Sequence, residues 1–370
     1  MEYRKIRAII SGGGTGGHIF PAVSIAGKLR EVNPETEILF VGAQGRMEME
    51  KVPAAGYKIV GLPIAGLQRR LTLSNIAVPF KVAGSVFKAR RILKEFKPDI
   101  AVGVGGYASA PLLYAATRMG IPTLIQEQNG FAGLTNKILG RRAGRICVAY
   151  EGMEKFFPSE KIVFSGNPIR PEIHPYGVAE RQEGLEYYGF DPSRRHILVV
   201  GGSLGSGTLN KALMAWIEQG CPGGEDVEVL WQCGRYYKPA VDEFMKGRDV
   251  PAIHWSDFIG RMDLAYAMAD VVISRSGASS VSEICAARKA AVLVPSPNVT
   301  EDHQTHNALA LVEKDAAILV KDADAVRDLM DTALGLLRDG RRLNIMGQNT
   351  SSLARLDAAQ TIVDEIYKLI

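Results

Sequence analysis

The chain has 370 residues, of which 46% are hydrophobic and 23% are charged. This balance is that of a globular protein and excludes a disordered, collagenous or coiled-coil chain. The length fits two domains of roughly 100–200 residues each. The net charge of +4 is too small to predict nucleic-acid binding. Four cysteines without a CxxC pair predict neither disulfides nor a zinc site, and they fit a reducing cytoplasm.

Two observations bear on membrane association. The apolar run 6–10 is too short for the core of a signal peptide, and no stretch approaches the roughly 18 apolar residues of a membrane helix. Residues 58–97, by contrast, contain nine basic residues and one acid, Glu95, so this segment alone carries a charge of +8. We therefore expect any membrane contact to be peripheral.

Short apolar runs alternate with helix-length segments along the whole chain. Several runs are continuously apolar, which is typical of parallel strands covered on both faces. The alternation predicts an α/β fold with right-handed crossovers. In chain order, we expect strands at 6–10, 38–41, 100–104, 122–125, 145–148, 196–200, 227–232, 270–273 and 291–294.

Glycine-rich turns follow strands in both halves of the chain. The order of strand, glycines and helix at 9–17 is repeated at 198–207, and a second glycine turn follows each, at 101–106 and 271–277. Two similar halves predict two nucleotide-fold domains, joined by the polar segment 165–175. The helical spacing of apolar residues from 353 to 369 predicts a C-terminal helix that packs on one of the domains.

The first glycine turn, Gly12 to Gly17, fits the pattern GxGxxG. Such a turn lets backbone amides reach a phosphate at a helix N-terminus, although a tight turn without a ligand is the alternative. A dinucleotide enzyme would need an acidic residue at the end of the second strand, and Gly42-Ala43-Gln44 stand there, which weakens an NAD hypothesis. Pro21 is expected in the first turn of the following helix.

Three side chains have functional groups suited to catalysis or to binding a substrate. His18 follows the glycines at the strand ends, where it could be a general base or a helix-start histidine bonded to a carbonyl. Glu283, three residues after Ser280, fits a capping box or a carboxylate that binds a ribose diol. Arg170 is either a surface residue or a bidentate ligand of a diphosphate.

Three weaker patterns have structural alternatives. The acid and histidines at 302–306 resemble metal ligands, but no third strong ligand is near them. Asp322-Ala323-Asp324 reads as DxD, and we interpret it as a helix cap because acids stabilise a helix N-terminus. Segment 75–96 mixes apolar and basic residues, as a lipid-docking surface or an amphipathic helix on its own core would. Pro79 argues against a single regular helix there.

Taken as a set, the motifs are similar in order and spacing to those of one family. They are Gly13-Gly14-Thr15-Gly16-Gly17-His18 with Pro21-Ala22, Gly105-Gly106-Tyr107, Glu127-Gln128-Asn129, Gly166-Asn167-Pro168-Ile169-Arg170, Gly201-Gly202-Ser203, and Arg275-Ser276-Gly277 to Ser282-Glu283. Over nearly its whole length the chain resembles the MurG glycosyltransferases. Each motif alone is weak, and the resemblance depends on the whole set.

The resemblance implies an α/β protein of the GT-B glycosyltransferase fold, with two Rossmann-like domains facing across a cleft. It implies inverting transfer of N-acetylglucosamine (GlcNAc) from UDP-GlcNAc to the 4-hydroxyl of undecaprenyl-diphosphoryl-N-acetylmuramoyl-pentapeptide. That reaction is the last cytoplasmic step of peptidoglycan precursor synthesis, on which cell shape and division depend. The implied domains are 1–166 for acceptor and membrane docking, 167–345 for UDP-GlcNAc, and a C-terminal helix in 346–370 returning to the first domain.

The implied location is peripheral, at the cytoplasmic face of the bacterial inner membrane. The implied partners are UDP-GlcNAc, the undecaprenyl-diphosphate-linked acceptor and an anionic membrane surface, with wall-synthesis or division proteins as further candidates and no nucleic acid. No cofactor and no metal are expected, because backbone amides and Arg170 would stabilise the leaving diphosphate.

The resemblance also assigns roles to single residues. His18, Tyr107 and Glu127 are expected to be catalytic, with His18 the first candidate for the general base and Glu127 the alternative. The UDP-GlcNAc residues are Thr15, Gly16, Gly17, Asn129, Arg170, Ser203, Ile259, Ala278, Ser279, Ser280, Glu283 and Gln304. The acceptor diphosphate residues are Gly13, Gly14, Gly105 and Gly106, and the membrane residues are Ile76, Phe80, Lys81, Phe87, Lys88, Arg90 and Arg91.

The chain departs from the family pattern at two places. Thr305 stands where many members have a second glutamine, so one sugar contact is absent. Ser279 and Ser280 stand where the family has Leu-Thr, which keeps the hydroxyl and loses a packing residue. Three other functions are considered: a UDP-GlcNAc 2-epimerase, which shares the fold, a dinucleotide oxidoreductase, and an inactive scaffold that binds a UDP-sugar.

Overall fold

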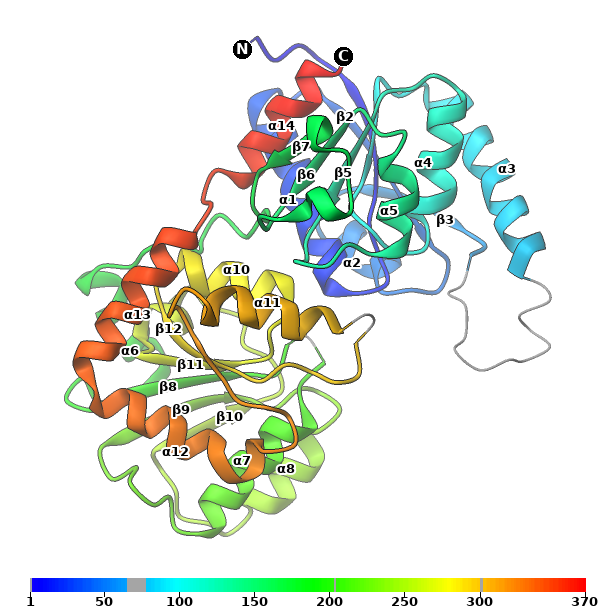
Figure 1. The fold of residues 1–370 in the computed structure, drawn as a ribbon. Coiled ribbons are helices and arrows are strands. Elements are labelled where there is room, and N and C mark those ends of the chain that lie inside the picture. Colours follow the sequence, from blue (N-terminus) through cyan, green and yellow to red (C-terminus); the bar gives the residue numbers. More distant parts are fainter. Residues whose placement is uncertain (1, 65–77, 203, 300–301) are drawn as a thin grey trace. The chain divides into compact units, whose positions relative to one another are not determined.

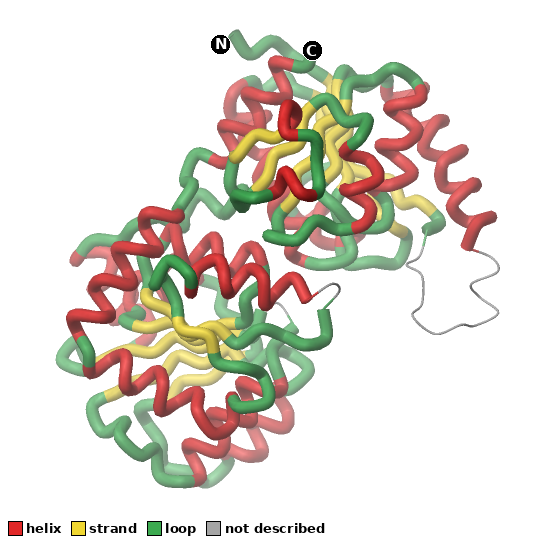
Figure 2. Tube along the Cα trace, viewed as in Figure 1, coloured by secondary structure: helices red, strands yellow, loops and turns green. Residues whose placement is uncertain are grey.

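The computed structural model describes residues 2–64, 78–202, 204–299 and 302–370, without the side chains of residues 78–81. The chain divides into two compact units (Figure 1). Unit 1 is Met1–Ile169 with Arg355–Ile370, and unit 2 is Arg170–Ala354. Each unit is a parallel sheet with helices on both faces (Figure 2).

Unit 1 contains a seven-stranded sheet in the order β3-β2-β1-β4-β5-β6-β7. All neighbouring strands are parallel. Its elements are β1 (Arg7–Ser11), α1 (Gly16–Val32), β2 (Glu37–Ala43), α2 (Glu48–Ala54), β3 (Lys58–Leu62), α3 (Val78–Phe96), β4 (Ile100–Gly103), α4 (Ser109–Arg118), β5 (Thr123–Glu127), α5 (Leu134–Gly140), β6 (Arg145–Val148), the 3₁₀ turns Met153–Lys155 and Ser159–Lys161, β7 (Ile162–Phe164) and α14 (Ala358–Lys368).

The core of unit 1 has two sides because successive residues of a strand point to opposite faces. Ile9 of β1 packs with residues of α3 and α4. Its neighbours Ala8 and Ile10 pack on the other face with residues of α1 and α14. All three are fully buried, so the middle of β1 has no exposed side and a ligand could meet this strand only at its ends.

Unit 2 repeats this architecture with six parallel strands in the order β10-β9-β8-β11-β12-β13. Ile197 and Val199 of β8 pack in one core with residues of α7 and α12. Its elements are α6 (Val178–Tyr188), β8 (Arg195–Val200), α7 (Gly207–Glu218), β9 (Val227–Gln232), α8 (Lys238–Met245), β10 (Ile253–Ser256), α9 (Met262–Met268), β11 (Val271–Ser274), α10 (Ala278–Ala286), β12 (Ala290–Leu293), α11 (His303–Val312), β13 (Ile318–Leu319), α12 (Ala325–Arg338) and α13 (Gly340–Leu353).

In each unit the strand order reverses beside the first strand. The reversal lies between β1 and β4 in unit 1 and between β8 and β11 in unit 2. In open α/β sheets, ligands bind outside the carboxyl ends of the strands at such a switch point. The four glycine turns of the sequence follow these four strands, so the internal repeat corresponds to the two switch points.

Four strands were not expected from the sequence: β3, β7, β10 and β13. They are the outermost strands of the two sheets. An outer strand has one neighbour and lies partly in contact with solvent, so it does not need the continuous apolar run of a central strand. β7, for example, has no fully buried residue.

Two local expectations were wrong. Pro21 is the sixth residue of α1, so it lies past the first turn. Helix α3 is a single helix that includes Pro79, which its first turn accommodates because the amides there need no partner within the helix. The expected C-terminal helix is α14, which packs on α1 in unit 1, whereas the first residues of the tail 346–370 belong to the end of α13, in unit 2.

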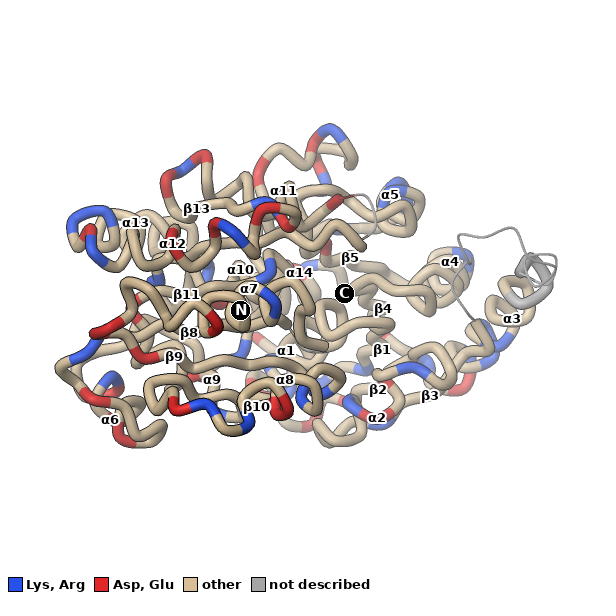
Figure 3. The backbone as a smooth tube through the Cα atoms, turned by 90° about the horizontal axis from the view of Figure 1, so that it is seen from below, with Lys and Arg blue, Asp and Glu red and all other residues tan. Residues whose placement is uncertain are grey.

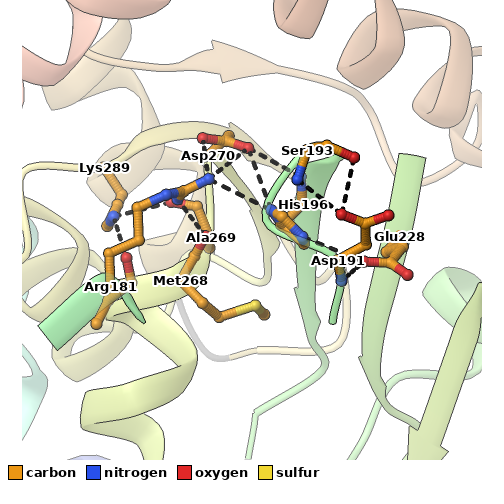
Figure 4. A network of polar contacts seen from close by, with 10 residues as sticks. Arg181, Asp191, Ser193, His196, Glu228, Met268, Ala269, Asp270 and Lys289 are labelled. Carbon is orange, nitrogen blue, oxygen red and sulfur yellow. Dashed lines mark hydrogen bonds and ion pairs between the residues drawn. The ribbon is translucent and has the colours of Figure 1, made fainter. Parts of the chain in front are cut away.

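A buried polar network joins the other end of the unit 2 sheet to its helices (Figure 4). Arg181 of α6 forms an ion pair with Asp270 at 3.1 Å, and Asp270 accepts the amide of His196 at 2.9 Å. The His196 ring, fully buried, lies 3.2 Å from Glu228. Burial by itself raises the pKa of Asp270, but the His196 hydrogen bonds and the Arg181 charge lower this pKa overall.

Lys289 completes the network. Its ammonium donates to the carbonyls of Ala267 at 3.2 Å and Ala269 at 2.8 Å. Burial, helped by the Arg181 charge and opposed by Asp270, lowers the pKa of Lys289 to about 8. A neutral amine keeps two N–H donors, so both hydrogen bonds can survive loss of the proton.

The shifted pKa of Lys289 predicts a pH-dependent stability. Between about pH 8 and pH 10.4 the unfolded chain binds more protons at this site, so the contribution of Lys289 to the free energy of unfolding rises with pH. The unmodified chain should therefore gain stability relative to Lys289→Met across this window, measured by urea unfolding. Lys321→Met, at an exposed lysine, is the control. A difference from Lys289→Met that does not change with pH would contradict the expectation.

Candidate functional site

The turn after β1 places His18 at the switch point of unit 1. Thr15 is the N-cap of α1, and His18 lies in the first turn of that helix. A side chain at Gly105 would come within 2.8 Å of His18 Nε2, and one at Gly106 would overlap the carbonyl of Gly13. The turns after β1 and β4 therefore pack directly on each other, and the missing side chains at the two glycines allow it.

The surroundings of His18 indicate which ring nitrogen carries its proton. His18 Nδ1 lies 3.1 Å from the carbonyl oxygen of Gly13 and 3.3 Å from the hydroxyl of Thr15. A carbonyl can only accept a hydrogen bond, so this contact requires a proton on Nδ1, and in a neutral ring the lone pair is then on Nε2. A neutral imidazole of this kind is suited to accept a proton at Nε2.

The amides of the glycine turn are not all open to a ligand. The amide of Gly14, which has a φ of 88°, donates to the carboxylate of Glu48 at 2.9 Å. Binding of a diphosphate at this turn would therefore use the amides that begin α1, at Gly16 and Gly17, more than that of Gly14.

Glu127, at the end of β5, organises the loop that follows it. One carboxylate oxygen accepts the amide and the side chain of Asn129, at 3.1 and 3.3 Å. The other accepts the amide of Gly133 at 3.1 Å and the side chain of Asn136 at 2.9 Å. Burial raises the pKa of Glu127, and these four donors oppose that rise only in part. Four donors match the roughly four lone-pair sites of a carboxylate, so none is left for a substrate proton.

Hydrogen bonds join the β5 loop to the β4 turn. The side chain of Gln128 donates to the carbonyl of Val104 at 2.8 Å, and the side chain of Asn167 donates to the carbonyl of Gln128 at 3.0 Å. Tyr107, on the same β4 turn, is half exposed. The described contacts thus bring His18, Tyr107 and the Glu127 loop to one end of the unit 1 sheet.

In unit 2, Arg170 and Glu283 form a bidentate pair, with N–O distances of 3.0 and 2.9 Å. Tyr266 donates to the same carboxylate at 3.3 Å. Burial alone would lower the pKa of Arg170, but the Glu283 charge raises it overall. The capping-box interpretation of Glu283 is wrong, because α10 begins at Ala278 with Gly277 as its N-cap.

The first turn of α10 follows the switch-point strand β11 and contains Ala278, Ser279 and Ser280. Among the described residues, the buried hydroxyl oxygen of Ser279 has no hydrogen-bond partner. Gln304 is adjacent: its carbonyl accepts the hydroxyl of Ser276 at 2.8 Å, and its side-chain oxygen accepts the amide of Ser296 at 2.9 Å. A helix N-terminus with unsatisfied donors is suited to an anion.

The other residues singled out in unit 2 are Ile259 and the two acids of the DxD sequence, Asp322 and Asp324. Ile259, after β10, lines a cavity of about 280 Å³ together with Tyr188 and Trp255. Asp322 is not a helix cap, because it forms an ion pair with Arg275 at 2.5 Å, while Asp324 holds the N-cap position of α12 without a side-chain cap. Ser203 lies outside the described residues.

Helix α3 carries the predicted membrane residues that can be described (Figure 3). Phe87 is 77% exposed, and Arg90 is exposed. Arg91 forms an ion pair with Glu95 at 2.7 Å, whereas the ammonium of Lys88 donates to the carbonyl of Gly61 at 2.8 Å, which leaves it less available to a headgroup. Ile76, and the side chains of Phe80 and Lys81, lie outside the described residues.

Two features are absent from the described residues: a membrane-spanning helix and a cluster of metal ligands. No helix in the described part of the chain combines the length and apolarity needed to cross a membrane. No three His, Cys, Asp or Glu side chains of the described residues come together as metal ligands, and those at 302–306 are no exception.

Two Rossmann-like units with glycine turns at their switch points are typical of the GT-B fold, and the matching family is one of glycosyltransferases. Residues 8–148 match the glycosyltransferase family 28 N-terminal domain, and residues 196–362 match the C-terminal domain of that family.

Relatives over the full length narrow the class. A Parabacteroides distasonis protein named UDP-N-acetylglucosamine–N-acetylmuramyl-(pentapeptide) pyrophosphoryl-undecaprenol N-acetylglucosamine transferase is 54% identical, covering 99% of both chains. The crystal structure of Acinetobacter baumannii MurG is 31% identical, with a TM-score of 0.78 over 99% of this chain and 100% of that one. A UDP-GlcNAc 2-epimerase from Neisseria meningitidis, 13% identical with a TM-score of 0.68 over 98% and 100% of the two chains, shares the fold alone. The chain belongs to the MurG family.

The four contacts of Glu127 predict a loss of stability in Glu127→Gln. The new NH₂ group would face N–H donors and leave at least one buried group unpaired, which costs about 1–3 kcal/mol of the free energy of unfolding. We expect this loss in urea unfolding, with Glu160→Gln, at an exposed residue, as the control. Native stability together with a loss of turnover greater than about tenfold would instead identify Glu127 as the general base.

Proposed function

We propose that the chain transfers GlcNAc from UDP-GlcNAc to the 4-hydroxyl of N-acetylmuramoyl-pentapeptide carried on undecaprenyl diphosphate. The observation that carries this proposal is the identity of more than half of the residues, over the full length, with a transferase named for this reaction. In our proposal unit 2 binds the donor, and unit 1 binds the acceptor and supplies the base.

Donor binding is assigned to the switch point of unit 2. The first-turn amides of α10 and the hydroxyl of Ser279 would meet the diphosphate, as expected for a helix N-terminus that binds phosphate. Glu283 would bind the ribose diol and hold Arg170 in place for the diphosphate, since the two side chains are already paired. Ser203, Ile259 and Gln304 would complete the donor site.

The reaction would be a direct inverting displacement. The acceptor oxygen attacks the anomeric carbon as the bond from that carbon to the diphosphate breaks, and UDP leaves with the bonding electrons. The proton of the acceptor hydroxyl passes to His18 Nε2, the ring nitrogen with the lone pair. Arg170 and the amides of α10 stabilise the negative charge that develops on the leaving diphosphate. Tyr107 and the Glu127 loop would position the acceptor.

The acceptor's lipid tail requires that the protein work at a membrane surface. Exposed Phe87 and the basic residues of α3 would bind anionic headgroups at the cytoplasmic face of the inner membrane. In this proposal membrane binding is peripheral and independent of the chemistry.

The proposed function is tested by transfer of labelled GlcNAc from UDP-GlcNAc to a short-chain lipid-linked muramoyl-pentapeptide. We expect a β-1,4-linked product and transfer that persists in EDTA. Release of UDP without acceptor would instead favour the epimerase or a hydrolase, and binding without any turnover would favour a scaffold.

The same assay tests His18. Removal of a general base costs about 10²–10⁴-fold in turnover, so His18→Gln should lose this factor at saturating substrates and keep its affinity for UDP-GlcNAc. His174→Gln, at a histidine of unit 2, serves as the control. A loss in His18→Gln much smaller than tenfold would exclude His18 as the base.

Neutralising two arginines of α3 should weaken membrane binding and spare the chemistry. Each basic residue at an anionic surface contributes about 1 kcal/mol, so Arg90→Gln with Arg91→Gln should lower affinity for anionic vesicles about 30-fold. Turnover on a soluble acceptor analogue should be unchanged. The matched control replaces the exposed Arg341 and Arg342 of unit 2. Equal sedimentation of both double variants with vesicles would contradict docking through α3.

A further inference from the structure

A buried carboxylate lies behind the first glycine turn, and no motif of the sequence pointed to it. Glu48 is the first residue of α2, and it is 1% exposed. One of its oxygens accepts the amide of Gly14 and the other accepts the amide of Ala43, both at 2.9 Å. The carboxylate therefore ties the turn after β1 to the end of β2.

Two glycines provide the space that Glu48 occupies. A side chain at Gly42 would come within 2.6 Å of Glu48 Cγ, and a side chain at Gly13 would overlap the carboxylate itself. The turn is thus built around Glu48. Burial of a carboxylate is costly unless hydrogen bonds compensate for the lost water, and here both oxygens are used on backbone amides.

One peptide unit contacts both Glu48 and His18. The peptide that joins Gly13 to Gly14 directs its N–H to Glu48 and its carbonyl to His18 Nδ1, at 2.9 and 3.1 Å. A trans peptide is planar, with its N–H and carbonyl pointing in opposite directions. Fixing the N–H with Glu48 therefore also fixes the direction of the carbonyl that accepts the His18 proton.

We propose that Glu48 is a positioning residue, which holds the Gly13–Gly14 peptide so that its carbonyl keeps His18 protonated on Nδ1 with the lone pair on Nε2. The proposal rests on the function proposed above, in which Nε2 takes the acceptor proton. In many enzymes a carboxylate orients a histidine by direct contact. Here a backbone peptide stands between them, and the close packing of Gly106 on the Gly13 carbonyl restricts the peptide further.

Kinetics on Glu48→Gln form the first test. The glutamine keeps one acceptor and turns an NH₂ group toward the second amide, so the link from the Gly13–Gly14 peptide through residue 48 to Ala43 loses one of its two hydrogen bonds. Turnover at saturating substrates should fall about tenfold, the lower end of the range for lost outer-shell partners, while KM for UDP-GlcNAc is unchanged. Glu50→Gln is the matched control, because Glu50 is an exposed residue of the same helix.

A double-mutant cycle shows whether Glu48 acts through His18. If it does, the variant with both Glu48→Gln and His18→Gln turns over no more slowly than His18→Gln alone. An equal factor lost in both backgrounds would mean that Glu48 contributes independently of His18, which would overturn the proposal.

The tautomer of His18 can be measured without the reaction. In a chain labelled with ¹⁵N-histidine, the His18 signals are those missing from His18→Gln. We expect a protonated Nδ1 and an unprotonated Nε2 in the unmodified chain and in Glu50→Gln, and a mixture of tautomers in Glu48→Gln. A proton on Nε2 in the unmodified chain, or the unmodified tautomer in Glu48→Gln, would overturn the proposal.

The two kinds of measurement separate this proposal from the proposed function. If His18→Gln keeps native turnover, the function assigned to His18 fails, while the tautomer still tests the link to Glu48. If Glu48→Gln does not fold, Glu48→Asp takes its place, because the shorter carboxylate cannot reach both amides. The tautomer of the unmodified chain needs no Glu48 variant, only His18→Gln for the assignment of the signals.

Discussion

Both faces of each parallel sheet are buried, and this constraint decides where chemistry can occur. Ile9 of β1 faces one layer of helices while Ala8 and Ile10 face the other, so the strand offers no side chain to a ligand. A ligand can therefore meet polar groups only at the ends of the strands, and at the carboxyl ends the reversal of strand order opens space for it. His18, after β1, and the first turn of α10, after β11, each lie at the switch point of their own unit for this reason.

Three buried glutamates give these strand ends their shape. Glu48 binds backbone amides, Glu127 binds two amides and two asparagine side chains, and Glu283 binds an arginine and a tyrosine. A buried carboxylate without partners would cost several kcal/mol, so each one forces its donors into a fixed arrangement. The loops around the site are therefore held by acids that need not touch the reacting atoms, which leaves His18 Nε2 as the group suited to proton transfer.

The sequence predicted the parts of the structure that depend on local pattern. Central strands were found because burial on two faces demands continuous apolar runs, and the outer strands β3, β7, β10 and β13 were missed because they need no such runs. His18 and the α10 turn were predicted from glycine spacing and family resemblance. The Arg170–Glu283 pair joins residues 113 positions apart, and the contact of Glu48 with Gly14 joins residues 34 positions apart. Only the folded chain brings such groups together.

The fold does not decide the reaction. A UDP-GlcNAc 2-epimerase that is only 13% identical to this chain has the same fold. Epimerisation needs no acceptor substrate, so an epimerase has no acceptor hydroxyl to deprotonate. A transferase needs a base at the acceptor with the correct nitrogen unprotonated before the acceptor binds. In the proposed mechanism the carbonyl of Gly13 meets that need, since its contact with His18 Nδ1 favours a proton on that nitrogen. Preorganisation of this kind lowers the activation barrier, because the protein does not have to rearrange during the reaction. It comes from the turn after β1 in unit 1 and does not depend on the sugar that unit 2 binds.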